Sequence, residues 1–120
     1  MNKICTSIEQ SQKLIELGID IITADMYWCS RKLQWGEITE TLIAYPMLPN
    51  QEKSREFKYF PAWSLTVLLE LTPNNVSLLH FEDAYQAVYD VKPYYITNKS
   101  DNPLDAVFEM VCWLKENNKL

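Results

Sequence analysis

The spacing of hydrophobic and polar residues changes along the chain, and the most apolar stretch lies near its middle. Residues 60–73 are apolar at most positions, with polar breaks such as Ser64 and Glu70. Wound as a helix, this stretch is apolar around most of its circumference and should be buried on most faces. Pro61 suits a first helical position, and Pro73 disfavours helical geometry at the residue before it. We therefore predict a buried central helix over residues 60–73.

The N-terminal half is predicted to contain one amphipathic helix and one strand. The helix is expected over about residues 7–17, and its capping box begins at either Thr6 or Ser7. Residues 19–28 show no clear period and are expected to form a short irregular connector. The β-branched and aromatic pattern of residues 38–45 predicts the first strand.

The C-terminal half is predicted to contain three strands and a terminal helix. Three short runs with strand-like composition, residues 76–82, 84–91 and 94–97, are joined by turns, as in an antiparallel meander. Asn102 then places a capping side chain directly before Pro103, and an amphipathic stretch follows. This arrangement predicts that a helix starts there.

A long connection separates the two halves. Residues 46–59 contain prolines and a mixed-charge run, with no period that suits burial, and we expect a surface loop. The predicted order is helix, strand, helix, three strands, helix. It indicates an α+β fold, with about three helices packed on one face of a mainly antiparallel sheet of about four strands. Because no internal linker divides the chain, residues 1–120 are expected to form a single domain.

Charge and cysteine usage restrict the classes of partner and compartment. The 16 acidic residues outnumber the 11 Lys and Arg, and the net charge of -5 argues against a nucleic-acid partner. No segment has the length of a signal peptide's apolar region or a membrane span, so we expect a cytoplasmic protein without a membrane partner. Cys5, Cys29 and Cys112 are odd in number and widely spaced, as expected for reduced thiols.

The sequence contains no recognised catalytic, metal or cofactor motif. With one histidine, His80, and no paired C-x-x-C spacing, a metal site is not expected. The two glycines do not form a phosphate-binding loop or a dinucleotide fingerprint, and no serine lies in a nucleophile elbow. We therefore expect no cofactor and no catalytic residue. The alternatives are a small enzyme or small-molecule binder with a pocket near His80, and an acidic inhibitor that imitates nucleic acid.

Aromatic residues are abundant, with four Trp, seven Tyr and four Phe. One small core cannot comfortably bury all of these side chains. Aromatic side chains with a polar tip are enriched at protein interfaces. The ordinary explanation for this abundance is that the tyrosines are half-buried in a sheet. The functional explanation is that the aromatic residues form a surface that binds another protein or a second copy of the chain. The candidate surface consists of Tyr27, Trp28, Trp35, Tyr85, Tyr89, Tyr94 and Tyr95. The leading hypothesis is a non-enzymatic module that binds a protein or itself.

Several short segments stand out together: residues 5–11, 14–20, 23–26, 61–65 and 102–106, and Glu109-Met110. In combination they resemble a group of uncharacterised small proteins of gut Bacteroides and their relatives, often met in prophage or other mobile-element surroundings. The resemblance implies a bacterial cytoplasmic setting and transfers no catalytic residue.

Overall fold

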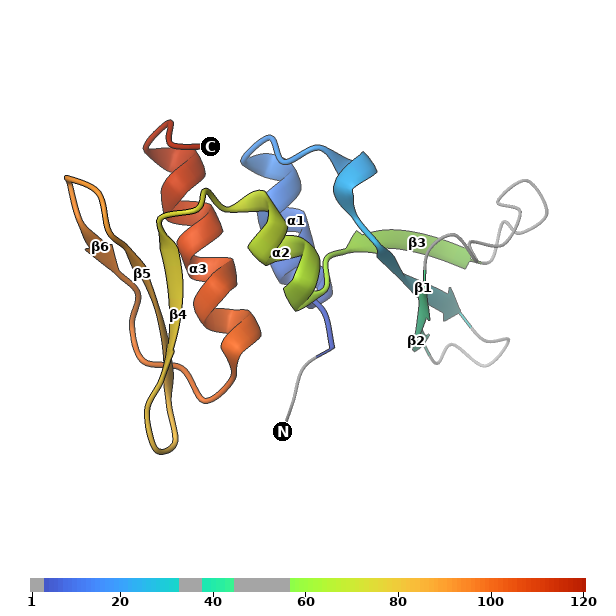
Figure 1. Ribbon diagram of the computed structural model, residues 1–120. Coiled ribbons are helices and arrows are strands. Elements are labelled where there is room, and N and C mark those ends of the chain that lie inside the picture. Colours follow the sequence, from blue (N-terminus) through green and yellow to red (C-terminus); the bar gives the residue numbers. More distant parts are fainter. Residues whose placement is uncertain (1–3, 33–37, 45–56) are drawn as a thin grey trace.

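A computed structural model describes residues 4–32, 38–44 and 57–120 (Figure 1). Within these residues the elements are α1 (Ile8–Glu16), the 3-10 turn η1 (Ile21–Thr23), β1 (Met26–Lys32), β2 (Ile38–Ala44), β3 (Phe57–Ala62), α2 (Leu65–Leu71), β4 (Val76–His80), β5 (Tyr85–Tyr89), β6 (Tyr95–Ile96) and α3 (Pro103–Glu116). All strand pairs are antiparallel. The predicted α+β class is confirmed.

The described strands form two three-stranded sheets in place of the single predicted sheet. Their orders are β2-β1-β3 in the first sheet and β4-β5-β6 in the second sheet. Figure 1 shows the helices between them, with α3 against the second sheet and α1 and α2 on the side of the first. Each sheet therefore lies at its own end of the molecule.

The first sheet contains two strands that the sequence pattern did not predict. The expected irregular connector over residues 19–28 is wrong from Met26 onward, where β1 begins. Met26 pairs with Ala44 on one side and with Ala62 on the other. Strand partners on both sides complete the backbone hydrogen bonds of β1, and no local signal reveals such partners.

The predicted central helix starts later than expected. Pro61 lies in β3, and α2 begins after Ser64, whose hydroxyl accepts the Val67 N–H at 3.4 Å. Because β3 is an edge strand, the missing N–H of Pro61 can be tolerated there. The end of the helix before Pro73 is as predicted. Of the predicted surface loop, residues 46–56 lie outside the described residues and residues 57–59 belong to β3.

Both predicted helix starts outside the central segment are confirmed. Ser7 begins the α1 capping box, since its hydroxyl accepts the Gln10 N–H at 3.1 Å and its own N–H donates to the Gln10 side chain at 3.0 Å. Asn102 caps α3 by accepting the Asp105 N–H at 2.8 Å. The Gln10 amide also donates to the Asp105 carboxylate at 2.7 Å, so the first turns of α1 and α3 are joined.

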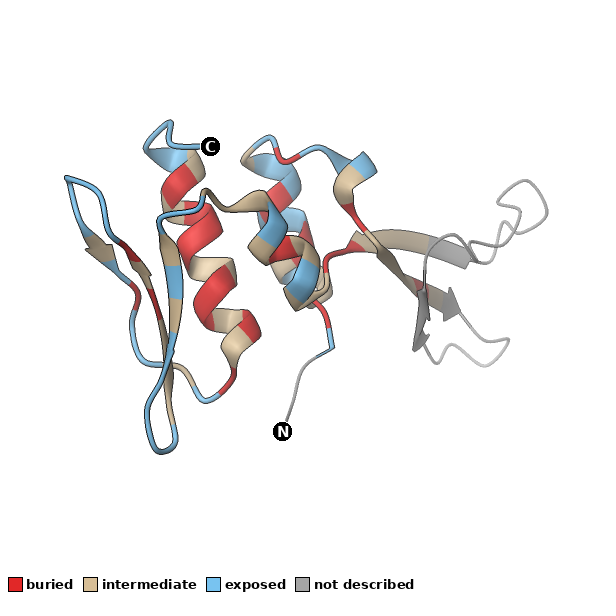
Figure 2. Ribbon diagram, in the orientation of Figure 1, coloured by how far each residue is buried: buried red, intermediate tan, exposed pale blue. Residues whose placement is uncertain are grey.

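The main core lies where the three helices meet (Figure 2). Trp63 is fully buried there, with large aliphatic side chains from all three helices: Leu14, Leu68, Leu104, Val107 and Val111. A smaller cluster joins the other side of α3 to the second sheet through Ala87, Tyr89, Met110 and Leu114. Two stripes of α3 are therefore buried against different neighbours.

Replacing Trp63 tests how far this core depends on one side chain. Trp63→Ala is expected to lower the free energy of unfolding by about 3–5 kcal/mol, because it leaves a large cavity. Trp63→Phe retains much of the apolar contact and should cost clearly less. Urea unfolding followed by far-ultraviolet circular dichroism measures both. Equal stability of Trp63→Ala and the unsubstituted protein would contradict this role.

Candidate functional site

Residue alternation in the second sheet decides which side chains face the helices. Residues directly opposite each other on paired strands share a face, and neighbours along a strand point to opposite faces. Ala87 and Tyr89 are buried, and Tyr95 pairs with Tyr89, so these three face α3. The register places Leu78 on the same face, opposite Ala87.

The tyrosines of this inner face are held by α3. The Tyr95 ring stacks on Trp113, with ring centroids 4.4 Å apart, and its hydroxyl donates to the Glu109 carboxylate at 3.1 Å. Tyr89 lies against the same indole at 5.6 Å. Burial, followed by the hydrogen bond and charge of Glu109, raises the pKa of the Tyr95 phenol. These tyrosines join the sheet to the helix.

The opposite face of the second sheet is unusually apolar for a face turned to solvent. Within the strands the register places Ser77, Leu79, Gln86, Val88 and Ile96 on this face. Continuing the same alternation just beyond the strand ends adds Phe81, Asp90, Tyr94 and Asn98. Five of these nine side chains are largely apolar, and we call them the open face: Leu79, Phe81, Val88, Tyr94 and Ile96. The solvent side of an antiparallel sheet is usually polar, so the pattern departs from expectation.

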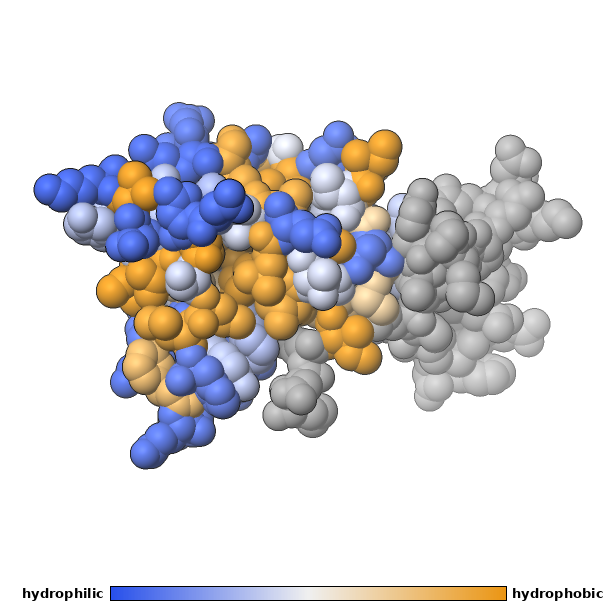
Figure 3. Space-filling view, viewed as in Figure 1, coloured by the Kyte–Doolittle hydropathy of each residue, from blue (hydrophilic) through white to orange (hydrophobic). Residues whose placement is uncertain are grey.

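Four members of the open face are strongly exposed. The exposed fractions are 41% for Leu79, 45% for Phe81, 61% for Tyr94 and 58% for Ile96, while Val88 is half-buried. Figure 3 shows hydrophobic side chains gathered over the second sheet, below a hydrophilic upper rim. The open face is therefore an apolar surface that the described residues leave accessible to water.

Charged residues lie at both ends of the open face. Glu82 and Asp83 form the turn between β4 and β5, and Asp90 and Lys92 lie at the turn between β5 and β6. These two turns are at opposite ends of β5 (Figure 1). At the first end, the Lys99 ammonium lies 5.7 Å from the centre of the Phe81 ring. Both signs of charge thus border the apolar surface.

The structure divides the aromatic surface predicted from the sequence. Tyr27 and Trp28 belong to β1 in the first sheet, and the Trp28 indole N–H donates to the Thr6 carbonyl at 2.8 Å. Trp35 lies outside the described residues. Tyr85 faces inward and stacks on His80 with centroids 4.3 Å apart. With Tyr89 and Tyr95 turned toward α3, Tyr94 is the one described member on the open face.

Sequence reasoning missed the aliphatic members of the open face. Val88 alternates with Ala87 and Tyr89 along its strand, and that alternation was the available signal. Leu79 follows Leu78 directly, so one leucine of the pair must point away from the helices. The seven residues of the predicted surface are all aromatic and include neither Leu79 nor Val88.

The described side chains offer little for catalysis. His80 is exposed on an edge strand, and no group of three or more His, Cys, Asp or Glu among the described residues could hold a metal ion. Burial raises the pKa of the Cys112 thiol to about 11, with Glu116 and Glu109 adding to the effect and Lys13 opposing it. Such a thiol stays protonated near neutral pH and is a poor nucleophile.

Comparisons with known proteins add no family and no fold relative. No protein-family model matches the chain, and no curated protein or solved structure matches it. The resemblance to Bacteroides proteins stays a prediction. None of the described helices has both the length and the apolar character needed to cross a membrane.

The buried thiol predicts a loss of stability in alkaline solution. Cys112 binds its proton more tightly in the folded state, so its stabilising contribution is full below the ordinary thiol pKa of about 9 and is lost as the pH rises through about 11. Urea unfolding midpoints at pH 8 and pH 10.5 should therefore differ less in Cys112→Ala than in the unsubstituted protein. Parallel losses in both proteins would assign the effect to other groups, of which Tyr95 is one.

Proposed function

We propose that this protein is a non-enzymatic module that binds another polypeptide through the open face of its second sheet. The observation that carries the proposal is the exposure of Leu79, Phe81, Tyr94 and Ile96 together on one side of one sheet. Contiguous apolar patches are limited on soluble proteins and often mark interaction sites. Burying such side chains is the dominant favourable term in most protein association.

The shape and surroundings of the open face favour a polypeptide over the alternative ligands. A pleated sheet surface is broad and shallow, whereas sites for small molecules are concave. His80, on which the small-molecule alternative depended, is exposed and stacks on Tyr85. An inhibitor that imitates nucleic acid would need carboxylates concentrated on one face, and here Lys92 and Lys99 border the same surface as the acids.

The setting that we propose is the cytoplasm of a bacterium. Cys5, Cys29 and Cys112 are buried and form no disulfide with one another, as expected for a protein kept under reducing conditions. The sequence resemblance to Bacteroides proteins supports the same setting.

Site-specific photocrosslinking tests the binding face. Purified protein carrying a photoreactive benzoylphenylalanine in place of Ile96 is irradiated in an extract of the source organism, and adducts are identified by mass spectrometry. The matched control places the same group at Ile22, which is 81% exposed on η1. We expect a defined polypeptide adduct from position 96 and none from position 22.

Competition experiments distinguish specific binding from non-specific adsorption. An excess of unlabelled protein should abolish the adduct, while an excess of Ile96→Lys should not. Because Ile96 is exposed, Ile96→Lys is expected to change the free energy of unfolding by no more than about 0.5 kcal/mol. Equal adducts from positions 22 and 96, or equal competition by Ile96→Lys, would refute the proposal.

A further inference from the structure

We infer that the polypeptide bound by the open face is a second copy of this chain, packed face to face with its strands antiparallel to those of the first. The inference rests on the proposed function, since it names the occupant of the same surface. Two observations lead to it: the pairing of Val88 with Ile96 on the open face, and the charges at the two ends of β5. The size of the sheet sets the expected affinity, and the placement of the helices leaves the face accessible.

The row of the open face that contains Val88 and Ile96 is suited to a two-fold axis. Val88 and Ile96 lie directly opposite each other on β5 and β6, and Ser77 of β4 lies in the same row. An axis that runs across the strands at this row places each of these side chains against its own equivalent in the second copy. Two sheets packed in this way lie about 10 Å apart and bury their facing apolar side chains, as in a β-sandwich. The same patch then serves both copies, as closed dimer symmetry requires.

The charges select this orientation of the second copy. An axis across the strands exchanges the ends of the sheet, so Glu82 and Asp83 of one copy meet the turn that contains Lys92 of the other. Lys99 likewise comes to the end that contains Asp90. An axis along the strands would bring the Glu82 and Asp83 turns of both copies together, where like charges repel. With the axis across the strands, Lys92 and Lys99 each meet a carboxylate of the other copy, and each end then holds three carboxylates and two lysines. With the axis along the strands, four carboxylates and two lysines would gather at one end.

The size of the sheet predicts a weak dimer. Three strands of at most five residues cover about 14 Å by about 17 Å, a flat footprint of roughly 240 Å². A stable interface of standard size buries about 800 Å² on each partner, so this footprint is small. We therefore expect monomers and dimers to exchange at micromolar concentration.

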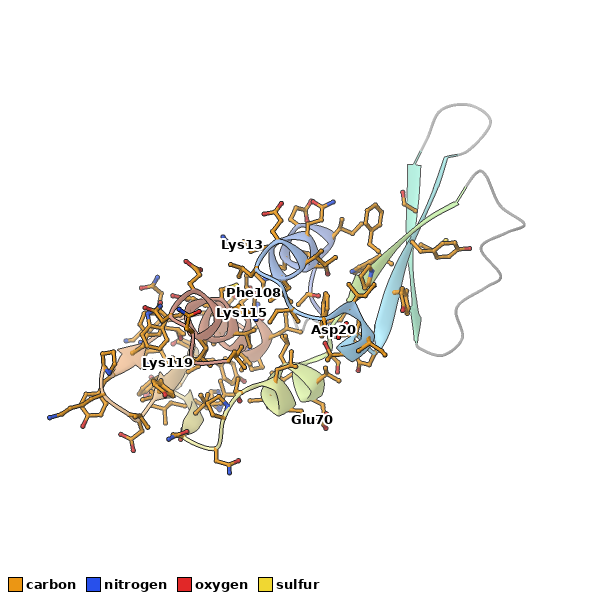
Figure 4. The ribbon with its side chains drawn as sticks, turned by 90° about the horizontal axis from the view of Figure 1, so that it is seen from above. Lys13, Asp20, Glu70, Phe108, Lys115 and Lys119 are labelled. Carbon is orange, nitrogen blue, oxygen red and sulfur yellow. The ribbon has the colours of Figure 1, made fainter. Side chains whose placement is uncertain are left out.

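The placement of the helices leaves the approach to this face open. Lys13 on α1 and Phe108 on α3 lie on the helix side of the second sheet in Figure 4, and α2 lies to one side. A sheet can thus approach the open face without meeting these helices. In the same view Lys13 lies away from the open face, so it is a suitable position for a control substitution that changes the net charge.

Sedimentation velocity of the purified full chain tests the occupant. Between 1 and 200 µM, the weight-average mass should rise from that of the 14.1 kDa monomer toward twice that value. Ile96→Lys should weaken association at least tenfold, and Ile22→Lys, at the exposed 3-10 turn, should leave it unchanged. A protein that remains monomeric at 200 µM, or that dimerises equally well with Ile96→Lys, overturns the inference.

Charge reversal tests the orientation. Lys92→Glu places acid against the Glu82 and Asp83 turn and should weaken association about fivefold, while Lys13→Glu makes the same change of net charge away from the interface and should have no effect. Adding Glu82→Lys to Lys92→Glu should restore association, because each copy then supplies the opposite charge. If Lys92→Glu has no more effect than Lys13→Glu, or the second substitution does not rescue it, the antiparallel arrangement is wrong.

The two proposals fail in different ways. If the purified chain is monomeric and position 96 crosslinks to a different protein that wild type but not Ile96→Lys displaces, the second-copy inference fails and the binding face stands. If the chain is monomeric and no specific adduct forms at position 96, both fail. A dimer that Ile96→Lys disrupts, with a self-adduct at position 96, supports both.

Discussion

The contact between Trp63 and Thr6 fixes the relative position of the helices and the first sheet. The Trp63 backbone N–H donates to the Thr6 hydroxyl at 3.1 Å, and the Thr6 N–H donates to the Trp63 carbonyl at 2.9 Å. The indole N–H of Trp63 reaches the Thr23 hydroxyl at 2.8 Å, and the next residue, Ser64, donates to Asp25 through its backbone and its hydroxyl. Both Thr6 and Trp63 are fully buried. Unmatched polar groups at such depth would be costly, so this arrangement has few alternatives.

This anchor also explains why one face of the second sheet is left uncovered. Trp63 lies between β3 and α2, and its core draws α1 and α2 to one stripe of α3, which includes Leu104, Val107 and Val111. The other stripe of α3, with Met110 and Leu114, covers the inner face of the second sheet. All three helices are thus committed to one side of that sheet. Among the described elements, none remains for the side that carries Leu79 and Ile96.

The sequence predicted those parts of the fold that local chemistry determines. Ser7 and Asn102 mark helix starts through side-chain hydrogen bonds to nearby backbone, and the meander of β4 to β6 follows from short turns. β1 and β3 escaped prediction because Met26 finds its partners 18 and 36 residues away, at Ala44 and Ala62. Pro61 was ambiguous for a related reason. Its fixed φ suits a helix start or an edge strand, and the pairing with Tyr27 decides between them.

The candidate site was harder to predict because both faces of the second sheet are rich in apolar side chains. Alternation shows that Tyr89 and Val88 point in opposite directions, but it does not say which face α3 will cover. The structure buries the tyrosine side, where the Tyr95 hydroxyl bonds to Glu109 and its ring stacks on Trp113. A tyrosine can be buried at low cost when its hydroxyl has such a partner. Aliphatic side chains need no polar partner and gain only by leaving water, so Ile96 and Leu79 would gain most from a second apolar surface. Tyr89 and Tyr95, which the sequence suggested for an interface, thus help to build the monomer, while Ile96 and Leu79 stay exposed to water.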